Sequence, residues 1–447
     1  MALKITVIGT GYLGATHAAA MAELGFEVLG LDVVPEKIEM LAAGRVPMYE
    51  PGLEELLRLH VAGIEGSSGR LRFTTSYEEA GEFGDVHFMC VNTPQKHGEY
   101  ACDMSYVDAA FASLAPHLKR PALVVGKSTV PVGSAERLAR LLAEKAPAGQ
   151  DVELAWNPEF LREGFAVDDT LHPDRIVVGV RSERAEKLLR EVYATPLGEG
   201  SPFVVTDFPT AELVKTAANS FLATKISFIN AMAEVCEAAG GDVVKLAEAI
   251  GHDDRIGKKF LRAGVGFGGG CLPKDIRAFM ARAGELGADQ ALTFLREVDS
   301  INMRRRGHMV ELAREAVGGT SFLGKRVAVL GATFKPDSDD VRDSPALNVA
   351  GQIHLQGGQV TVYDPKGMDN ARRLFPTLGY ADTALEAVRG ADVVLHLTEW
   401  REFRELDPAE LKETVASAII LDGRNALDAG AWREAGWTYR AMGRPRA

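Results

Sequence analysis

Residues 9–14 read Gly-Thr-Gly-Tyr-Leu-Gly, and this stretch decides the fold of the N-terminal part of the chain. It follows a β-branched run and precedes a stretch whose composition predicts a helix. In a strand–turn–helix of this kind, Gly9 allows the tight turn, Gly11 lets the backbone approach a pyrophosphate, and Gly14 lets helix and strand pack closely. The helix N-terminus offers N–H groups to phosphate oxygens. The turn therefore predicts a dinucleotide site, which we favour over a glycine turn that binds nothing.

Asp32 predicts which dinucleotide is bound. It ends the second predicted strand, residues 26–31, about 20 positions after the middle glycine of the turn. A carboxylate at this place accepts a hydrogen bond from a ribose 2′-hydroxyl and repels a 2′-phosphate. We therefore expect NAD rather than NADP.

The order of predicted strands and helices gives the fold class. Further apolar strand candidates alternate with helical stretches up to about residue 206, which predicts a parallel sheet covered on both faces. Residues 210–239 contain no Gly or Pro and predict one long helix, and residues 276–317 read as helical with a break near Gly287. From residue 325 four buried strands alternate with helices again. We predict an α/β protein with two Rossmann-like, doubly wound parallel-sheet domains joined by a central helical domain, with segments 1–206, 207–318 and 319–447.

Composition excludes several classes of protein. The 447 residues carry a net charge of −12, which argues against a nucleic-acid binder. Four cysteines without a CxxC pair predict neither a zinc knuckle nor a disulfide framework, so we expect no metal and a reducing cytoplasm. No apolar run reaches membrane-spanning length, and the N-terminus lacks a signal-peptide pattern.

A cysteine follows the least ordinary stretch of the sequence. Five of the seven residues 264–270 are glycine, which suits close approach of the backbone to a ligand. Cys271 follows directly, and Lys274 and Asp275 lie within four positions of it. A nearby cation favours the thiolate, the reactive form of cysteine. The loop therefore predicts a nucleophile. The other cysteines, Cys90, Cys102 and Cys236, lie in apolar or loop contexts and predict no chemistry.

A nucleophilic thiol beside an NAD site indicates a four-electron oxidation. One hydride leaves an alcohol to give an aldehyde, but a second can leave only from a tetrahedral adduct. A thiolate supplies that adduct as a thiohemiacetal, and its oxidation gives a thioester that water hydrolyses.

The chain resembles the UDP-glucose dehydrogenase branch of the UDP-glucose/GDP-mannose dehydrogenase family over nearly its full length. The motifs that carry the resemblance occur in family order: GTGYLG at 9–14, VNTP at 91–94, STVPVG at 128–133, NPEFLREG at 157–164, ELVKTAANSFLATKISFIN at 212–230, GVGFGGGCLPKD at 264–275, FKPDSDDVRDSP at 334–345 and DGRN at 422–425.

The resemblance implies residue roles. The implied catalytic set comprises a nucleophile, an oxyanion-stabilising pair on one helix face, a carboxylate that moves protons, a base for the hydrolytic water and its partner: Cys271, Lys215 with Asn219, Asp275, Glu159 and Thr129. The implied NAD contacts are Gly9, Gly11, Tyr12, Leu13, Gly14, Asp32, Lys37, Thr93, Thr129, Glu163, Lys274 and Arg342. The implied contacts to the sugar nucleotide are Glu159, Phe160, Leu161, Arg162, Lys215, Asn219, Arg255, Phe260, Leu261, Arg262, Gly264, Gly268, Phe334, Lys335 and Arg424, with Arg255 serving the site of a partner subunit.

The implied activity is NAD-dependent oxidation of UDP-glucose to UDP-glucuronate. The segments then become an NAD-binding domain, a dimerisation domain with the cysteine loop and a UDP-sugar-binding domain, in a cytoplasmic homodimer joined through the long apolar helix. Two departures bear on the substrate: Gly270 stands where serine is frequent, and Leu272 is also familiar from GDP-mannose dehydrogenases. RIGKKFLRAGVGFGG at 255–269 favours the UDP-glucose type, and Lys274 and the absence of a histidine before Cys271 disfavour the N-acetylmannosamine branch.

Three alternatives remain open. The first is GDP-mannose 6-dehydrogenase or another nucleotide-hexose 6-dehydrogenase, with the same mechanism. The second is a hydroxyacid or 3-hydroxyacyl-CoA dehydrogenase, which needs no thiol. The third is a non-catalytic NAD-binding module.

Overall fold

A computed structural model describes residues 3–63 and 69–445 of the chain. They divide into two compact units. Unit 1 comprises residues up to Ala218 together with Arg277–Leu286, and unit 2 comprises Asn219–Ile276 with the chain from Gly287 onward. The predicted segment boundaries after residues 206 and 318 stay a prediction.

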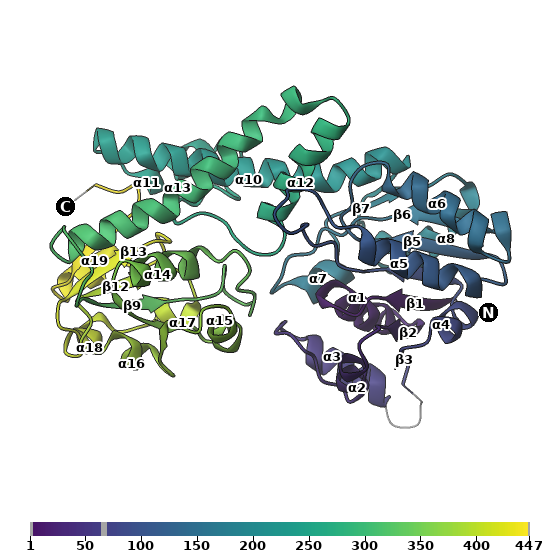
Figure 1. Cartoon of the computed structure of the whole chain (residues 1–447), viewed down its shortest axis with the longest axis horizontal. Coiled ribbons are helices and arrows are strands. Elements are labelled where there is room, and N and C mark those ends of the chain that lie inside the picture. Colours follow the sequence, from purple (N-terminus) through teal and green to yellow (C-terminus); the bar gives the residue numbers. More distant parts are fainter. Residues whose placement is uncertain (1–2, 64–68, 446–447) are drawn as a thin grey trace. The chain divides into compact units, whose positions relative to one another are not determined.

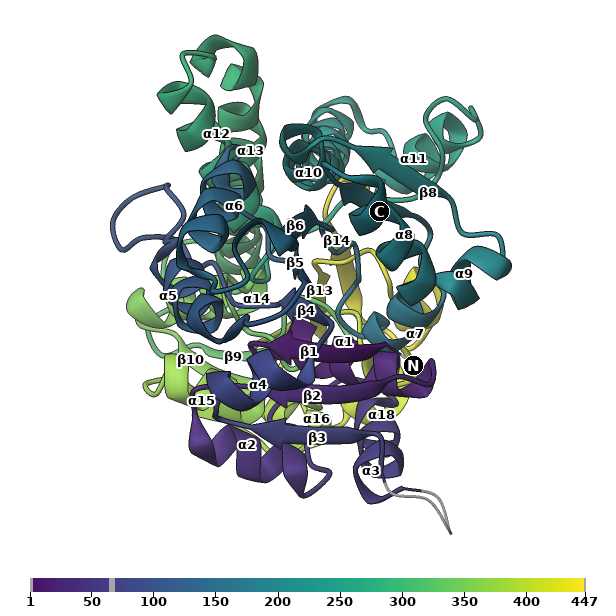
Figure 2. The same ribbon diagram turned by 90° about the vertical axis from the view of Figure 1, so that its right-hand side faces the viewer.

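The first 206 residues contain a sheet of eight strands in the order β3-β2-β1-β4-β5-β6-β7-β8 (Figure 1). Figure 2 shows β1, β2 and β3 side by side in this order. The elements are β1 (Lys4–Ile8), α1 (Tyr12–Glu23), β2 (Glu27–Leu31), α2 (Pro35–Ala42), α3 (Leu53–Ala62), β3 (Leu71–Thr74), α4 (Tyr77–Phe83), β4 (Val86–Met89), α5 (Ser105–Leu114), η1 (Ala115–His117), β5 (Ala122–Gly126), α6 (Ser134–Lys145), η2 (Gly149–Asp151), β6 (Val152–Trp156), α7 (Ala166–Leu171), β7 (Ile176–Gly179), α8 (Glu183–Val192), α9 (Ala194–Gly198) and β8 (Phe203–Thr206).

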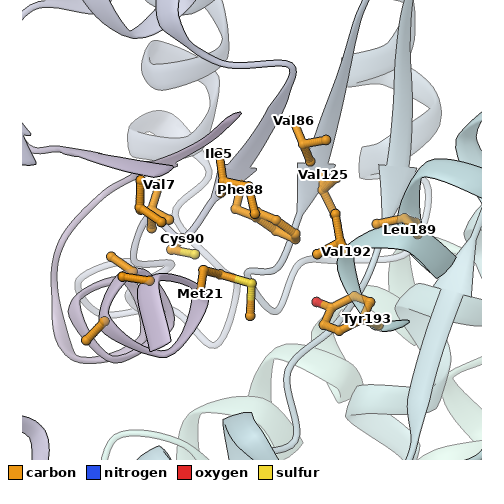
Figure 3. Packing of buried hydrophobic residues seen from close by; sticks show 14 of the residues in the cluster. Ile5, Val7, Met21, Val86, Phe88, Cys90, Val125, Leu189, Val192 and Tyr193 are labelled. Atoms are coloured by element: carbon orange, nitrogen blue, oxygen red, sulfur yellow. The ribbon is translucent and has the colours of Figure 1, made fainter. Parts of the chain in front are cut away.

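Both faces of this sheet are buried, as the sequence predicts. In β1, Ile5 and Val7 pack into one core cluster with Val86 and Phe88, and Ile8 packs into the cluster on the other face. Figure 3 shows part of the first cluster. Because alternate residues of a strand point to opposite faces, a sheet covered on both faces needs apolar residues at nearly every position.

The strand order reverses between β1 and β4. β1 pairs in parallel with β2 on one side and with β4 on the other. In open α/β sheets, ligands bind at the carboxyl ends of the strands beside such a switch point. The Gly9–Gly14 turn follows β1 and the VNTP loop follows β4, so the fold brings both to this edge.

Two strands, β7 and β8, run opposite to the other six and so depart from the predicted parallel arrangement. β7 pairs with β6 in antiparallel fashion, through Trp156 and Gly179. The chain between them therefore starts and ends at the carboxyl edge of the sheet instead of crossing back. Residues 157–164 stay at that edge for this reason.

The central helices match the prediction closely. They are α10 (Phe208–Ala239), α11 (Val243–Gly251), α12 (Leu272–Glu285), the short η3 (Asp289–Leu292) and α13 (Thr293–Ala316). The predicted break near Gly287 is confirmed, because φ is +75° at this residue between α12 and η3.

The C-terminal sheet has six parallel strands in the order β11-β10-β9-β12-β13-β14, which is again the doubly wound order. Its elements are β9 (Arg326–Leu330), α14 (Pro345–Leu355), β10 (Gln359–Tyr363), α15 (Met368–Leu374), β11 (Gly379–Tyr380), α16 (Ala384–Val388), β12 (Val393–His396), α17 (Arg401–Arg404), α18 (Pro408–Lys412), β13 (Ile419–Asp422), α19 (Ala429–Glu434) and β14 (Thr438–Ala441). The predicted fold class is therefore confirmed: two mainly parallel α/β sheets and a central helical region.

Candidate functional sites of the two units

The glycine turn has the geometry that a dinucleotide site needs. Gly9 has φ +86°, and a Cβ added to Gly14 would overlap the Gly9 carbonyl oxygen. Gly11 is the N-cap of α1 and has no side chain to fill the space before the helix. The N–H groups of the first turn of α1 are therefore open to a phosphate.

Asp32 lies where its predicted role requires. It is buried at the end of β2, and its Oδ2 accepts hydrogen bonds from Thr10 N at 2.9 Å and from Lys37 Nζ at 2.7 Å. Lys37, which we expect near the adenosine ribose, thus lies directly beside this carboxylate. Asp32 directly follows β2 and Lys37 lies in the first turn of α2, so local structure alone brings the two side chains together.

A carboxylate that the sequence analysis missed joins the turn to the NPEFLREG segment. Glu50 is buried and accepts hydrogen bonds from Gly164 N at 2.6 Å, from Ala166 N at 2.7 Å and from the Tyr12 hydroxyl. Burial and the Glu50 hydrogen bond raise the pKa of Tyr12 far above its usual range, so this hydroxyl stays a donor. Glu50 precedes Pro-Gly in MYEPGLEELL, and that acidic residue before a turn was the available signal.

The loops after β4 and β5 are tied to each other. Thr93 Oγ1 donates to the Thr129 carbonyl at 2.8 Å, and Ser128 Oγ donates to the Val91 carbonyl at 2.6 Å. Both predicted NAD contacts, Thr93 and Thr129, therefore lie on one ordered pair of loops at the carboxyl edge.

Glu159 and Lys215 form a nearly buried ion pair. Lys215 Nζ lies 3.0 Å from Glu159 Oε1, and the side chains are 6% and 13% exposed, respectively. The other carboxylate oxygen of Glu159 accepts from Leu161 N at 2.8 Å. The Lys215 ammonium also lies 5.6 Å from the centre of the Phe160 ring. Residues 157–164 and the start of α10 thus hold Glu159 in one orientation.

Arg162 lies in the same segment, but its hydrogen bonds go to Asp169. Its backbone N–H and guanidinium all donate to Asp169, at distances of 2.5 to 2.9 Å. Its predicted contact with the sugar nucleotide stays a prediction.

Unit 2 holds the cysteine. Cys271 is exposed and directly precedes α12, whose amide groups and dipole favour a thiolate at this end. Asp275 is 1% exposed, and its carboxylate is held by Lys274 Nζ at 2.5 Å and Asn219 Nδ2 at 2.7 Å. Asp275 N donates to the Cys271 carbonyl at 2.8 Å. Cys271, Lys274, Asp275 and Asn219 therefore form one cluster. Asn219 joins it although it lies far from the other three in the sequence.

The glycine loop before Cys271 is clamped by α13. Asn302, fully buried, accepts from Phe267 N at 2.7 Å and donates to Phe267 O at 3.0 Å. Gly266 has φ +91°, and a Cβ there would overlap the Asn302 side chain. Arg306 Nη2 donates to Phe267 O at 3.1 Å. Neither clamping residue was predicted, because a polar residue on a helix carries no signal of its partner.

Arg424 is fully engaged by backbone. Its guanidinium donates to the carbonyls of Leu397 at 2.7 Å, Gly266 at 2.9 Å and Phe334 at 3.0 Å. It thereby ties the DGRN motif to the cysteine loop and to the segment that carries the predicted contacts Phe334 and Lys335. Its own contact with the sugar nucleotide stays a prediction.

The other predicted cations lie at the surface of unit 2 with acidic neighbours. Arg342 donates to Asp340 and Arg255 to Asp253, each with a shortest distance of 2.7 Å, and Arg262 lies 3.5 Å from Glu399. Phe260 has φ +65°, which is rare for a residue with a side chain. Leu261 is buried and Gly264 N donates to Asn230 Oδ1 at 2.9 Å.

Two findings concern only the described residues. Within 3–63 and 69–445, no group of three or more His, Cys, Asp or Glu side chains is placed to hold a metal ion. In the same part of the chain, no helix combines the length and apolarity that crossing a bilayer requires.

In a comparison with known proteins, this chain matches the UDP-glucose/GDP-mannose dehydrogenase family. Residues 3–197 match its NAD binding domain, 209–304 its central domain and 328–429 its UDP binding domain. A UDP-glucose 6-dehydrogenase of Rhizobium meliloti is 42% identical over 99% of this chain and 100% of its own length. The protein named YwqF of Bacillus subtilis, also a UDP-glucose 6-dehydrogenase, is 39% identical over 99% of this chain and 98% of its own.

A solved structure of a protein with a similar sequence has the same fold. The UDP-glucose dehydrogenase of Pyrobaculum islandicum superposes with a TM-score of 0.90 at 37% identity, over 99% of this chain and 98% of its own. The predicted cofactor, NAD, is confirmed by the family's NAD binding domain, and the hydroxyacid dehydrogenase alternative falls away. This chain belongs to the UDP-glucose/GDP-mannose dehydrogenase family and is an NAD-dependent oxidoreductase.

Proposed function

We propose that this enzyme oxidises UDP-glucose to UDP-glucuronate in two oxidations and one hydrolysis. The relatives named UDP-glucose 6-dehydrogenase, which match over essentially the whole chain, support the substrate. The observation that carries the mechanism is Cys271, an exposed thiol at the start of α12 beside Lys274 and Asp275.

The residues of unit 1 fit NAD. The turn has no room for a Cβ at Gly14, and Asp32 offers a carboxylate to a ribose. NAD, when bound, accepts a hydride in each oxidation. Its proposed contacts are Gly9, Gly11, Tyr12, Leu13, Gly14, Asp32, Lys37, Thr93, Thr129 and Glu163, with Lys274 and Arg342 from unit 2.

Cys271 makes the second oxidation possible. Its thiolate bonds to the aldehyde carbon, and the oxygen of that carbon becomes the hydroxyl of a thiohemiacetal. Loss of hydride and a proton from this adduct leaves a thioester on the sulfur. Lys215 and Asn219 are the donors proposed for the negative oxygen that develops in these steps.

Glu159 is the base proposed for hydrolysis, with Thr129 as a partner of the water. The Lys215 ammonium and Leu161 N each hold one oxygen of Glu159, so the carboxylate is oriented before water arrives. Asp275 is the proton-moving carboxylate beside the thiol, and Lys274 and Asn219 hold its two oxygens.

The sugar nucleotide has proposed contacts in several segments of the chain. We assign its UDP part to the C-terminal sheet, because the family's UDP binding domain matches there. The proposed contacts are Glu159, Phe160, Leu161, Arg162, Lys215 and Asn219, and from the rest of the chain Arg255, Phe260, Leu261, Arg262, Gly264, Gly268, Phe334, Lys335 and Arg424. Leu272 keeps GDP-mannose, or another nucleotide hexose, as the second candidate.

We propose a homodimer joined through α10. Phe221, Phe228 and Val235 are 66%, 49% and 56% exposed, and they are spaced by seven residues on the unit 2 part of this helix. Residues at this spacing share one face, and an exposed apolar stripe of that kind marks an interface. Sedimentation of Phe228→Glu should show a monomer, with Leu355→Glu, at a position that is 86% exposed, as the matched control that stays dimeric. We also propose a cytoplasmic location, because all four cysteines are free and Cys271 must stay reduced.

The yield of NADH per sugar nucleotide tests the reaction. UDP-glucose should give about two NADH, one for each oxidation of the thioester route, and GDP-mannose should react much more slowly. A yield of one, with an aldehyde product, contradicts the proposal, and faster turnover of GDP-mannose reassigns the substrate.

Two variants separate the steps. Cys271→Ser should bind both ligands but lose acid formation, because a serine hydroxyl is hardly ionised near neutral pH. Glu159→Gln should give a burst of NADH and a sugar-nucleotide adduct on the Cys271 peptide, seen by mass spectrometry of quenched enzyme. Cys236→Ser is the matched control, since this thiol is buried in an apolar cluster, and it should keep normal turnover. Acid formation at the normal rate by Cys271→Ser rules out the covalent route.

A further inference from the structure

A cavity of about 50 Å³ lies within unit 1 and is lined by Glu159 together with His17, Lys127, Asn157 and Tyr193. A site for a nucleotide or a sugar is several times larger. One water needs roughly 10–15 Å³ of such volume, so this cavity has room for about three to five waters. Its wall also includes Asp174, which is exposed, so the cavity reaches the surface of the unit.

His17 gives the cavity a polar wall that needs water. It is 1% exposed in α1, packs edge-on against Phe88, and neither ring nitrogen has a hydrogen-bond partner among the described residues. Burial lowers its pKa well below the usual range, and the charge of Lys127 lowers it further. The ring is therefore neutral, with one donor and one acceptor. A buried donor or acceptor that is left unsatisfied is destabilising, and water can satisfy both nitrogens.

Lys127 and Tyr193 form the second part of this wall. Lys127, 7% exposed, donates to Asn157 Oδ1 at 3.0 Å and to the Tyr193 oxygen at 3.3 Å. An ammonium group has three N–H bonds, so within the described chain one is left for the cavity. Burial raises the pKa of Tyr193, and its hydroxyl donates to Asn157 Oδ1 at 2.5 Å. Figure 3 shows the Tyr193 ring beside Val192, at the edge of the apolar cluster.

We propose that this cavity is a built water site that supplies the hydrolytic water to Glu159 and returns its proton to solvent, with His17, Lys127 and Tyr193 as positioning residues. The inference rests on the proposed function. This role explains why a neutral histidine and an ammonium group are buried beside the residue proposed as the hydrolytic base. Packing against the sheet alone would need only apolar side chains at these positions.

The step balances without an oxidant. The water oxygen bonds to the thioester carbon and one of its protons passes to Glu159. The carbon–sulfur bond then breaks, and the second proton goes to the departing sulfur of Cys271. The products are a carboxylate, a thiol and the proton on Glu159. That proton leaves through the cavity water, for which the neutral His17 ring can accept on one nitrogen and donate from the other.

Hydrolysis can be isolated by following NADH formation in the first turnover and the Cys271 adduct in quenched enzyme. His17→Leu removes both ring nitrogens and keeps the helix. We expect the first turnover to release about two NADH per subunit at the normal rate, the adduct to accumulate, and steady-state turnover to fall about a hundredfold, the lower end of the effect of losing a proton-transfer partner. Tyr193→Phe removes a single hydroxyl from a residue that stays buried, and it should show the same pattern to a smaller degree.

His87→Leu is the matched control. Like His17, His87 is fully buried, but it lies in β4; it has one ring nitrogen without a partner among the described residues and does not line the cavity. Its variant should hydrolyse the adduct at the normal rate. Equal slowing in His17→Leu and His87→Leu, or normal hydrolysis in both folded cavity variants, overturns the inference. If His17→Leu does not fold, Tyr193→Phe decides alone. A wild-type yield of one NADH with no adduct in Glu159→Gln is instead a failure of the proposed function.

Discussion

Replacing Asn302 by leucine tests whether α13 holds the cysteine loop in place. The change keeps the approximate size of the side chain and removes both hydrogen bonds to Phe267. Phe267 O still accepts from Arg306, but Phe267 N, in a buried residue, loses its acceptor among the described residues.

The expected cost follows from this arrangement. Two hydrogen bonds between neutral groups contribute about 0.5–1.5 kcal/mol each, and an orphaned buried N–H costs about 1–3 kcal/mol. Because the two losses overlap, we expect the loop to be destabilised by about 2–4 kcal/mol. At 1.4 kcal/mol per factor of ten, its detached state should become roughly 30- to 700-fold more populated.

Hydrogen exchange measured on peptides from residues 264–270 reads this population directly. Amide exchange in these peptides should accelerate by that factor, while peptides from the β1–α1 region of unit 1 stay unchanged. The rate at which iodoacetamide alkylates Cys271 should change as well, because the thiol directly follows this loop in the chain. Met303→Ala, at the next position and 40% exposed, is the matched control. Loop exchange within twofold of wild type in a folded Asn302→Leu protein refutes the clamp.

Three further predictions concern the two sheets. Gly14→Ala should weaken NAD binding at least tenfold or prevent folding of the first sheet, since the added Cβ overlaps the Gly9 carbonyl. Titration with NAD, followed by quenching of the protein fluorescence, checks this. Asp32→Asn should narrow the preference for NAD over NADP, measured as the ratio of kcat/KM values, because the charge facing a 2′-phosphate is removed. Burial alone would raise the pKa of Asp422, but the His396 hydrogen bond and charge and the backbone N–H groups lower it overall. A depressed folded pKa stabilises the protein above the unfolded value of about 3.9 and loses that effect as pH falls below it. The urea midpoint of the C-terminal sheet should therefore be flat above about pH 5 and drop toward pH 3, and Asp422→Asn should flatten that drop.

Much of the fold was predictable because its signals are local. The glycine turn, Asp32 and Lys37 lie within 29 residues of one another on consecutive elements, and hydrophobic periodicity places those elements. The long α10 was predictable for the same reason, since it lacks Gly and Pro. Strands β3, β6 and β8 were not predicted, because a charged residue interrupts the apolar pattern of β3 and β6 and because β8 is not buried.

What the sequence by itself determined is the kind of chemistry: a dinucleotide turn, a carboxylate that selects NAD, and a cysteine in a glycine loop each need only neighbouring residues. Tertiary structure alone decided how those groups are held. The direction of β7 keeps residues 157–164 at the ligand edge, Asn302 clamps Phe267 from 35 positions away, and Asp275 meets Asn219 across 56 positions. A polar side chain in a sequence does not show which distant backbone or carboxylate satisfies it, because that partner is set by packing of the whole unit. For this reason the contacts of Glu50 and the roles proposed for His17 and Lys127, whose residue types are ordinary, follow only from their buried surroundings.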